Sequence, residues 1–215
     1  MIRTLLLLLA LAGAARAAIV IGPGPALGTD KRGVTWFQEF QDWSDTDVKA
    51  LDQNNDQFKF NNAHDTARDI IAVYAREEGD HYYFRVDFFD LLLGSENGEL
   101  DVYVAIDCAA GGQQWFPDFT DTRTSHPWEI CIALYSGAAA TVYDSGFNNV
   151  TAGNWLGSYW RADLDSVEFG IKKSLLTARG WTAGTPIHFQ VFTTRDGTNG
   201  GAGEIGGSDI VDATG

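Results

Sequence analysis

Basic residues are scarce in this sequence, and their shortage excludes two classes of partner. The chain of 215 residues has 15 lysines and arginines against 29 aspartates and glutamates, a net charge of −14. Such an acidic protein repels phosphate groups, so we expect it to bind neither nucleic acid nor an anionic membrane surface. The acidic excess suits a soluble exported protein and leaves many oxygens for a hard cation such as calcium.

Common catalytic and cofactor motifs are missing as well. The sequence has no G-x-S-x-G turn and no H-E-x-x-H helix, so we expect no enzymatic activity. The only methionine is Met1. Because it would be removed with the predicted signal peptide described below, Met–His ligation of haem is excluded. Residues 201–206 read GAGEIG, like a dinucleotide loop, but nine residues remain after them, too few for the helix and strand that hold a nucleotide. We therefore expect neither haem nor a nucleotide.

Long apolar runs are confined to the N-terminus. Leu5–Ala12 is an unbroken apolar run that follows Arg3, and Ala15-Arg16-Ala17 has the small-x-small pattern of a signal-peptidase site. This predicts a signal peptide at residues 1–17, which is too short to span a membrane, and hence a secreted or extracytoplasmic protein. The alternative is a buried N-terminal helix.

The remaining residues predict one domain. Residues 18–34, rich in glycine and proline, predict an extended lead-in, residues 35–212 a single domain, and residues 213–215 a tail. This length fits one large all-β domain better than two domains. Trp36, Phe40 and Trp43 recur at helical spacing and predict a short helix.

Alternating apolar and polar residues predict antiparallel strands. After an apolar run at 70–75, alternation begins at His81 and recurs at 101–107, 128–135, 167–171 and 187–191. A helical turn is expected at 174–178. Strands with one apolar face and few crossover helices pack as two stacked sheets. The sequence therefore predicts an all-β, two-sheet antiparallel β-sandwich, jelly-roll-like, with one or two short helices.

Several of these segments, taken together, resemble a family of sandwich modules. They read DIIAVY at 69–74, YFRVDFFDL at 83–91, LDVYVAID at 100–107, WEI at 128–130, VEFGI at 167–171 and TRDG at 194–197. In this order they resemble the DOMON-like and family 9 carbohydrate-binding-module-like sandwiches. They are similar above all to the glucodextranase C-terminal-type modules attached to alpha-amylase-like glycosidases.

The resemblance covers residues 35–212 and implies a function without catalysis. It implies binding of a polysaccharide or oligosaccharide, a glucan above all, or support of a linked or separate glycosidase, often with structural calcium. Two alternatives remain open. The chain is an exported structural or interaction domain without a glycan site, or it is the N-terminal fragment of a larger glycoside hydrolase.

Aromatic residues in glycine-rich segments are the first candidates for sugar binding. Trp115 follows GGQQ, and Trp155 and Trp160 lie in GNWLGSYW. Rings presented on turns can stack on the apolar faces of sugars. The alternative is that these rings turn inward and close an open end of the sandwich. Trp128 and Trp181 are predicted to lie in the core.

The polar sides of the strands supply further candidates. We expect a polar face that could hold a glycan, with Tyr83, Arg85 and Asp87 as its main ligand-binding residues. Its other members would be Tyr103, Asp107, Glu129, His188 and Gln190. The alternative is the ordinary solvated side of an antiparallel sheet.

A calcium site is predicted in the segment Asp52–Asp56. Asp52, Asn54 and Asp56 place oxygens at alternate positions, as calcium loops do, with Asp65 or Asp69 as helpers. An EF-hand is excluded because Gln57 stands where the motif needs glycine and Ala63 where it needs glutamate. The alternative is a polar loop without metal.

The two cysteines, Cys108 and Cys131, form a candidate disulfide. An isolated pair in an oxidising compartment is often bridged. Strand parity argues against the bridge, because Cys108 continues the row of Val102, Val104 and Ile106, whereas Cys131 shares a row with Ala133 and Tyr135.

Overall fold

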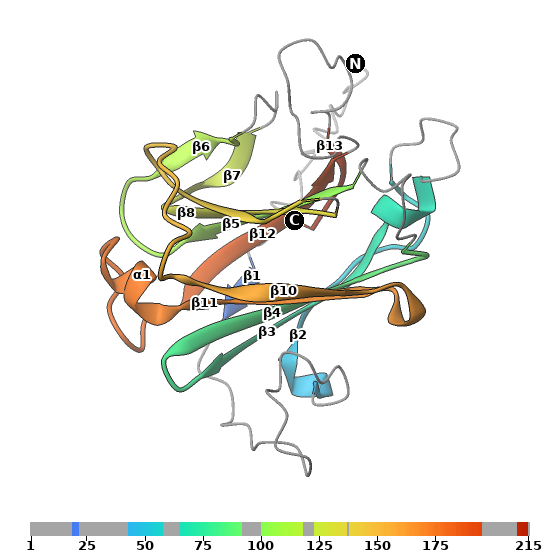
Figure 1. The fold of residues 1–215 in the computed structure, drawn as a ribbon, viewed down its shortest axis with the longest axis horizontal. Coiled ribbons are helices and arrows are strands. Elements are labelled where there is room, and N and C mark those ends of the chain that lie inside the picture. Colours follow the sequence, from blue (N-terminus) through green and yellow to red (C-terminus); the bar gives the residue numbers. More distant parts are fainter. Residues whose placement is uncertain are drawn as a thin grey trace, which may run out of the picture.

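The computed structural model describes residues 19–21, 43–57, 65–91, 100–117, 123–136, 138–194 and 210–214. In this part of the chain two large antiparallel sheets are stacked face to face (Figure 1), which confirms the predicted all-β sandwich. The predicted signal peptide lies outside the described residues, as do Trp36 and Phe40 of the expected helix. No described helix is long and apolar enough to cross a membrane.

The six-stranded sheet has the order β1-β12-β5-β8-β9, and β13 also pairs with β12. Its strands are β1 (Ile19–Ile21), β5 (Asp101–Asp107), β8 (Ile130–Tyr135), β9 (Thr141–Asp144), β12 (Ile187–Thr194) and β13 (Ile210–Ala213). The predicted lead-in therefore contributes a strand, because β1 lies within it.

The five-stranded sheet has the order β10-β11-β4-β3-β2. Its strands are β2 (Val48–Leu51), β3 (Ile70–Glu78), β4 (His81–Phe88), β10 (Trp155–Arg161) and β11 (Ser166–Lys172). The described helices are one α-helix, α1 (Lys173–Thr177), and 3-10 turns at Asp45–Asp47, Asp65–Arg68 and Ala162–Leu164. The helical turn expected at 174–178 corresponds to α1.

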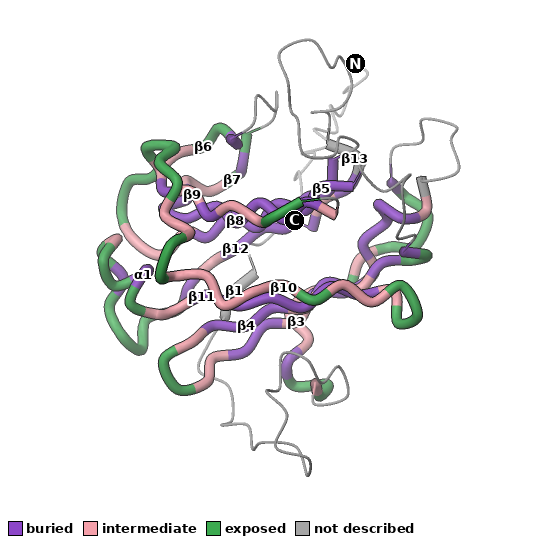
Figure 2. The backbone as a smooth tube through the Cα atoms, viewed as in Figure 1, coloured by how far each residue is buried: buried purple, intermediate pink, exposed green. Residues whose placement is uncertain are grey.

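The predicted apolar rows meet between the two sheets. Phe84 of β4 stacks on Phe169 of β11, with ring centroids 5.3 Å apart, and meets the edge of Phe189 of β12 at 5.6 Å. All three are buried, and Figure 2 shows buried residues along the facing strands. Burying each such side chain stabilises the fold by about 1.5–3 kcal/mol. Trp181 also joins this interior cluster, as predicted.

A second apolar cluster lies on the outer side of the six-stranded sheet. The hairpin of β6 (Gln113–Trp115) and β7 (Arg123–Trp128) lies over this side (Figure 1). The buried members of the cluster are Tyr103, Ala105, Phe116, Trp128, Cys131, Ala133, Tyr135 and Phe192. The prediction that this side is a polar face is therefore wrong for Tyr103, because the hairpin covers it.

Trp128 is buried as predicted, but in this outer cluster. The sequence predicted a continuous strand in which Trp128 shares a row with Ile130. Instead β7 ends at Trp128 and β8 begins at Ile130. Because the strand is interrupted at Glu129, Trp128 and Ile130 do not point to the same side of one strand. Trp128 packs in the outer cluster and Ile130 in the interior cluster.

Candidate functional site

Trp115 presents an exposed ring on the hairpin outside the six-stranded sheet. The residue is 42% exposed, and its register partner on β7 is Arg123. The guanidinium carbon of Arg123 lies 3.9 Å from the ring centroid. This cation–π contact restrains the ring and covers one of its faces. Trp115 thus has a held orientation and a solvent-exposed surface.

Trp155 and Trp160 lie on strand β10 and not in turns. Trp155 stacks on Phe169 with centroids 6.2 Å apart, and Trp160 stacks on Phe88 at 6.5 Å. Both are partly buried and pack against the interior cluster. The placement in turns was wrong, and the packing corresponds to the alternative in which the rings close the sandwich.

A bulge in β10 explains why both rings turn inward. Residues five apart on a regular strand face opposite sides. However, Trp155 pairs with Ile171 and Trp160 with Val167, which are four apart, and the register shifts between Trp155 and Gly157. The bulge adds one residue to β10, so Trp155 and Trp160 point to the same side of the sheet. Gly157 has φ 134°, which favours glycine.

The outer side of the five-stranded sheet carries the predicted polar residues of β4. Arg85 binds Asp87 through two contacts, Nε to Oδ1 at 2.5 Å and a terminal nitrogen to Oδ2 at 3.1 Å. The Arg85 guanidinium also lies 5.1 Å from the centre of the Tyr74 ring. Ser166 donates a hydrogen bond to Asp87 Oδ1 at 2.6 Å. Arg85 and Asp87 therefore face each other and not open solvent, at 15% and 13% exposure.

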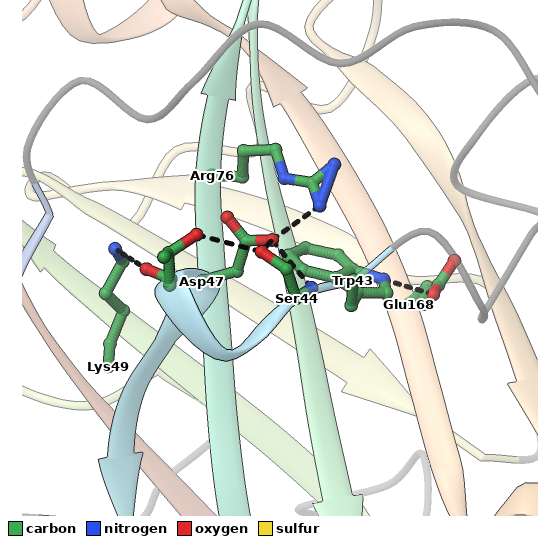
Figure 3. A network of polar contacts seen from close by, with 7 residues as sticks. Trp43, Ser44, Asp47, Lys49, Arg76 and Glu168 are labelled. Carbon is green, nitrogen blue, oxygen red and sulfur yellow. Dashed lines mark hydrogen bonds and ion pairs between the residues drawn. The ribbon is translucent and has the colours of Figure 1, made fainter.

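Trp43 covers part of this outer side (Figure 3). Its indole nitrogen donates a hydrogen bond to Glu168 of β11, and its ring meets the edge of Tyr74 with centroids 5.8 Å apart. The Arg76 guanidinium lies 4.9 Å from the centre of the Trp43 ring. Sequence reasoning missed this role because it assigned Trp43 to a helix.

A buried ion pair holds the segment after Trp43 on the sheet. Arg76 of β3 contacts Asp47 Oδ2 at 2.5 Å, and both side chains are only 1% exposed. The backbone nitrogen and the hydroxyl of Ser44 donate to the same carboxylate, each at 2.9 Å (Figure 3). The predicted polar face is thus covered here by the chain itself.

The predicted sugar-binding residues do not form one surface. Trp115 lies over the six-stranded sheet, whereas Arg85 and Asp87 lie on the outer side of the five-stranded sheet, and Trp155 and Trp160 on its inner side. Tyr83, also on β4, is 6% exposed. Four other predicted polar-face residues, Tyr103, Asp107, His188 and Gln190, lie on β5 and β12 of the six-stranded sheet. The prediction placed them on one face with the β4 residues because alternation within a strand does not specify which sheet the strand joins.

Glu129 is another predicted polar-face residue that the structure places elsewhere. It is buried, and one carboxylate oxygen accepts the backbone N–H groups of Cys108 at 2.8 Å and of Ala109 at 3.1 Å. Burial raises the pKa of Glu129, and the two backbone hydrogen bonds oppose that rise. Its role is to bind the loop after β5.

Three carboxylates form a candidate cation site between distant segments. Oxygens of Asp56, Asp69 and Asp212 lie within 4.8 Å of one another. The Ile70 backbone nitrogen donates to Asp212 Oδ2 at 2.6 Å. Burial raises the pKa of Asp212 to about 7, and the charges of Asp52 and Asp56 add to the rise. The oxygen ligands and the concentrated negative charge suit calcium.

This cluster overlaps the predicted calcium ligands only in part. Asp56 was predicted as a ligand and Asp69 as a helper. Asp52 is not one of the three; its Oδ1 accepts the backbone N–H of Gln53 at 2.9 Å. Asn54 is exposed. The side chain of Asp65 lies outside the described residues. Asp212 was missed because its strand is far away in sequence.

No disulfide joins Cys108 and Cys131, so the candidate bridge is absent from the structure. Cys108 packs against the interior cluster and Cys131 belongs to the outer one. The two side chains lie on opposite sides of the six-stranded sheet, as their positions in the alternating pattern indicated. Burial, reinforced by the charge of Glu129, raises the pKa of Cys108 to about 12.

No family model matches the chain, and no curated protein matches it.

Proposed function

We propose that the chain is a secreted, non-catalytic carbohydrate-binding or glycosidase-accessory module that contacts its glycan through Trp115. The observation that supports this most is the exposed Trp115 ring held by Arg123 at 3.9 Å. An indole of this kind can stack on the apolar face of a pyranose. The neighbouring Gln114 side chain is exposed and can exchange hydrogen bonds with sugar hydroxyls.

A single stacked ring supports weak binding. We expect dissociation constants from about micromolar to millimolar, or roughly 4 to 8 kcal/mol of binding free energy. Glucans are the first ligands to test, because the resemblance implies them. In the alternative function, a structural or interaction domain, Trp115 would contact no glycan.

Paired measurements on tryptophan variants test the proposal. Soluble α- and β-glucans are titrated into the purified chain and into Trp115→Ala, and the melting temperature of each is recorded. Trp115→Ala should lose most of the affinity and keep its stability, because an exposed ring contributes little to the core. Tyr159→Ala is the matched control, because Tyr159 is 43% exposed but lies on the other large sheet.

Trp160→Ala separates binding from folding. Trp160 stacks on the buried Phe88, so its removal should lower the melting temperature and leave glucan affinity unchanged in the folded fraction. A parent chain that binds no glucan, or a Trp115→Ala variant that binds as well as the parent, would support the structural alternative.

We also propose that calcium binds Asp56, Asp69 and Asp212. The ion would join three segments, since Asp56 lies in the loop after β2, Asp69 precedes β3 and Asp212 lies on β13. Calcium would offset the mutual repulsion of these carboxylates, and its role would be structural. This proposal is independent of the glycan surface.

A further inference from the structure

Two histidines and an aspartate meet on the outer side of the six-stranded sheet. One ligand atom from each of Asp107, His126 and His188 lies within 4.8 Å of the other two. His126 Nδ1 is 3.7 Å from Asp107 Oδ2. The two imidazole rings have centroids 5.5 Å apart and planes inclined by 72°. None of these residues belongs to the glycan or calcium sites proposed above.

The backbone fixes the positions of two of these side chains. Asp107 is the last residue of β5, and its register partner on the neighbouring strand β12 is His188. Directly paired residues on adjacent antiparallel strands point to the same side of the sheet. Asp107 and His188 therefore form a fixed pair.

Strand β7 supplies the third side chain. The Ser125 backbone nitrogen donates to Gln190 Oε1 at 3.0 Å. Gln190 is two residues after His188 on β12 and so points to the same side. The Thr124 hydroxyl also donates to the His126 carbonyl at 2.5 Å. The Ser125–Gln190 bond holds β7 against the sheet beside His126, and the Thr124 bond lies within β7 itself. The three groups are therefore positioned before any ligand arrives.

The separation of the groups is too long for a direct hydrogen bond. Such a bond needs about 2.7–3.2 Å between nitrogen and oxygen, whereas His126 Nδ1 and Asp107 Oδ2 are 3.7 Å apart. Two atoms that bind one zinc ion at about 2.0–2.1 Å with a tetrahedral angle lie about 3.4 Å from each other. The observed spacing is closer to that of two ligands of a shared ion.

The polar atoms of the cluster also indicate a missing partner. His188 Nδ1 is buried and has no hydrogen-bond partner among the described residues. A buried polar atom without a hydrogen-bond partner destabilises the folded state. Asp107 is partly buried, at 24% exposure, and His126 Nδ1, 3.7 Å away, would offset its charge only with a protonated imidazole. A bound cation would compensate the carboxylate and the imidazole nitrogens together.

We propose that Asp107, His126 and His188 bind a divalent transition-metal ion, with zinc as the best match. Two imidazoles and one carboxylate form a ligand set of the kind that holds zinc with three protein side chains and leaves a fourth position open. Imidazole nitrogens also select against calcium, which prefers oxygen ligands. His126 is 40% exposed, so the fourth position would face solvent.

Zinc binding to the purified chain, prepared without a histidine tag, tests this site. Titration is done with calcium in excess, so that oxygen-only sites are occupied. The wild type should bind one zinc ion. The double variant His126→Gln/His188→Asn should bind it more than about 10-fold more weakly, since even loss of an outer-shell partner costs about 10–100-fold. His81→Gln is the matched control, because His81 lies on β4 outside the cluster, and it should bind like wild type.

Spectroscopy on the wild-type chain gives an answer even if a variant fails to fold. Copper(II) loaded at one equivalent should show coupling to two imidazole nitrogens in pulsed electron paramagnetic resonance. A wild type that binds no zinc, a folded double variant that binds zinc like wild type, or a copper spectrum without imidazole coupling would each overturn the proposal.

Discussion

The ring of Tyr83 on β4 lies against Gly170 of β11, its register partner on the neighbouring strand. A Cβ atom at position 170 would lie 2.8 Å from Tyr83 Cδ1 and 2.9 Å from Leu156 Cδ1. Such contacts are too short for carbon atoms at rest, so the absence of a side chain at Gly170 allows the ring to lie on the sheet. Tyr83, a predicted sugar contact, therefore has a structural role on the outer side of the five-stranded sheet.

Gly170→Ala should lower the free energy of unfolding by about 1–3 kcal/mol, the usual cost of forcing extra volume into a packed site. Urea unfolding measures this change. The same substitution in a Tyr83→Ala background should cost less, because the ring that meets the new methyl is gone. Equal costs in the two backgrounds would show that the Tyr83 contact is not the cause.

Asp47→Ala should destabilise the fold by about 3–5 kcal/mol, because it leaves the buried Arg76 guanidinium without the carboxylate 2.5 Å away. The double variant Asp47→Ala/Arg76→Met should recover part of this loss, since a neutral side chain of similar length needs no counter-charge. Thermal or urea unfolding of the three proteins measures both effects. A double variant less stable than the single one would argue against this account.

Calcium should raise the melting temperature of the chain. An ion that binds only the folded state at about 100 times its dissociation constant stabilises it by about 2.7 kcal/mol. Asp212→Asn should abolish most of the response, whereas Asp163→Asn, at an exposed carboxylate paired with Arg161, should keep it. Identical melting temperatures in chelator and in millimolar calcium would remove the proposed site.

Both thiols should be found by mass spectrometry after alkylation in denaturant, because no bridge joins them. In the folded protein Cys108 should react slowly at neutral pH, since its pKa of about 12 leaves almost no thiolate. Its labelling rate should rise about tenfold per pH unit while the fold persists, as the thiolate fraction grows. Rapid labelling of native Cys108 near pH 7 would contradict this environment.

The interior of the sandwich could be predicted from sequence because its alternation is regular. Tyr82, Phe84, Val86 and Phe88 read as one face, and all four are buried in the interior cluster. Strand β5 runs from Asp101 to Asp107, the range that the alternation indicated. Burial on one side of a strand leaves a period of two that needs no knowledge of partners.

The outer features were less predictable because they depend on distant segments. In the alternating pattern, Ala105 and Cys131 lie on the side of the strand that faces away from the interior. In the structure both are buried there, because the β6–β7 hairpin covers them. Asp56 and Asp212 are close only because β13 returns to the sheet beside β12. His126 and His188 have no sequence spacing that suggests a shared site, and only the register of β5 with β12 and the position of β7 bring them together.

The strand pairing at the sheet edges has a consequence for association between molecules. An open, regular edge strand is a template for adding a strand from another copy, which leads to aggregation. One edge of β12 is divided between the two terminal strands, with β1 on residues 187–189 and β13 on 192–194. On the five-stranded sheet, β2 and β10 both carry register shifts. Loss of either terminal strand would expose part of the β12 edge and make the protein prone to strand exchange.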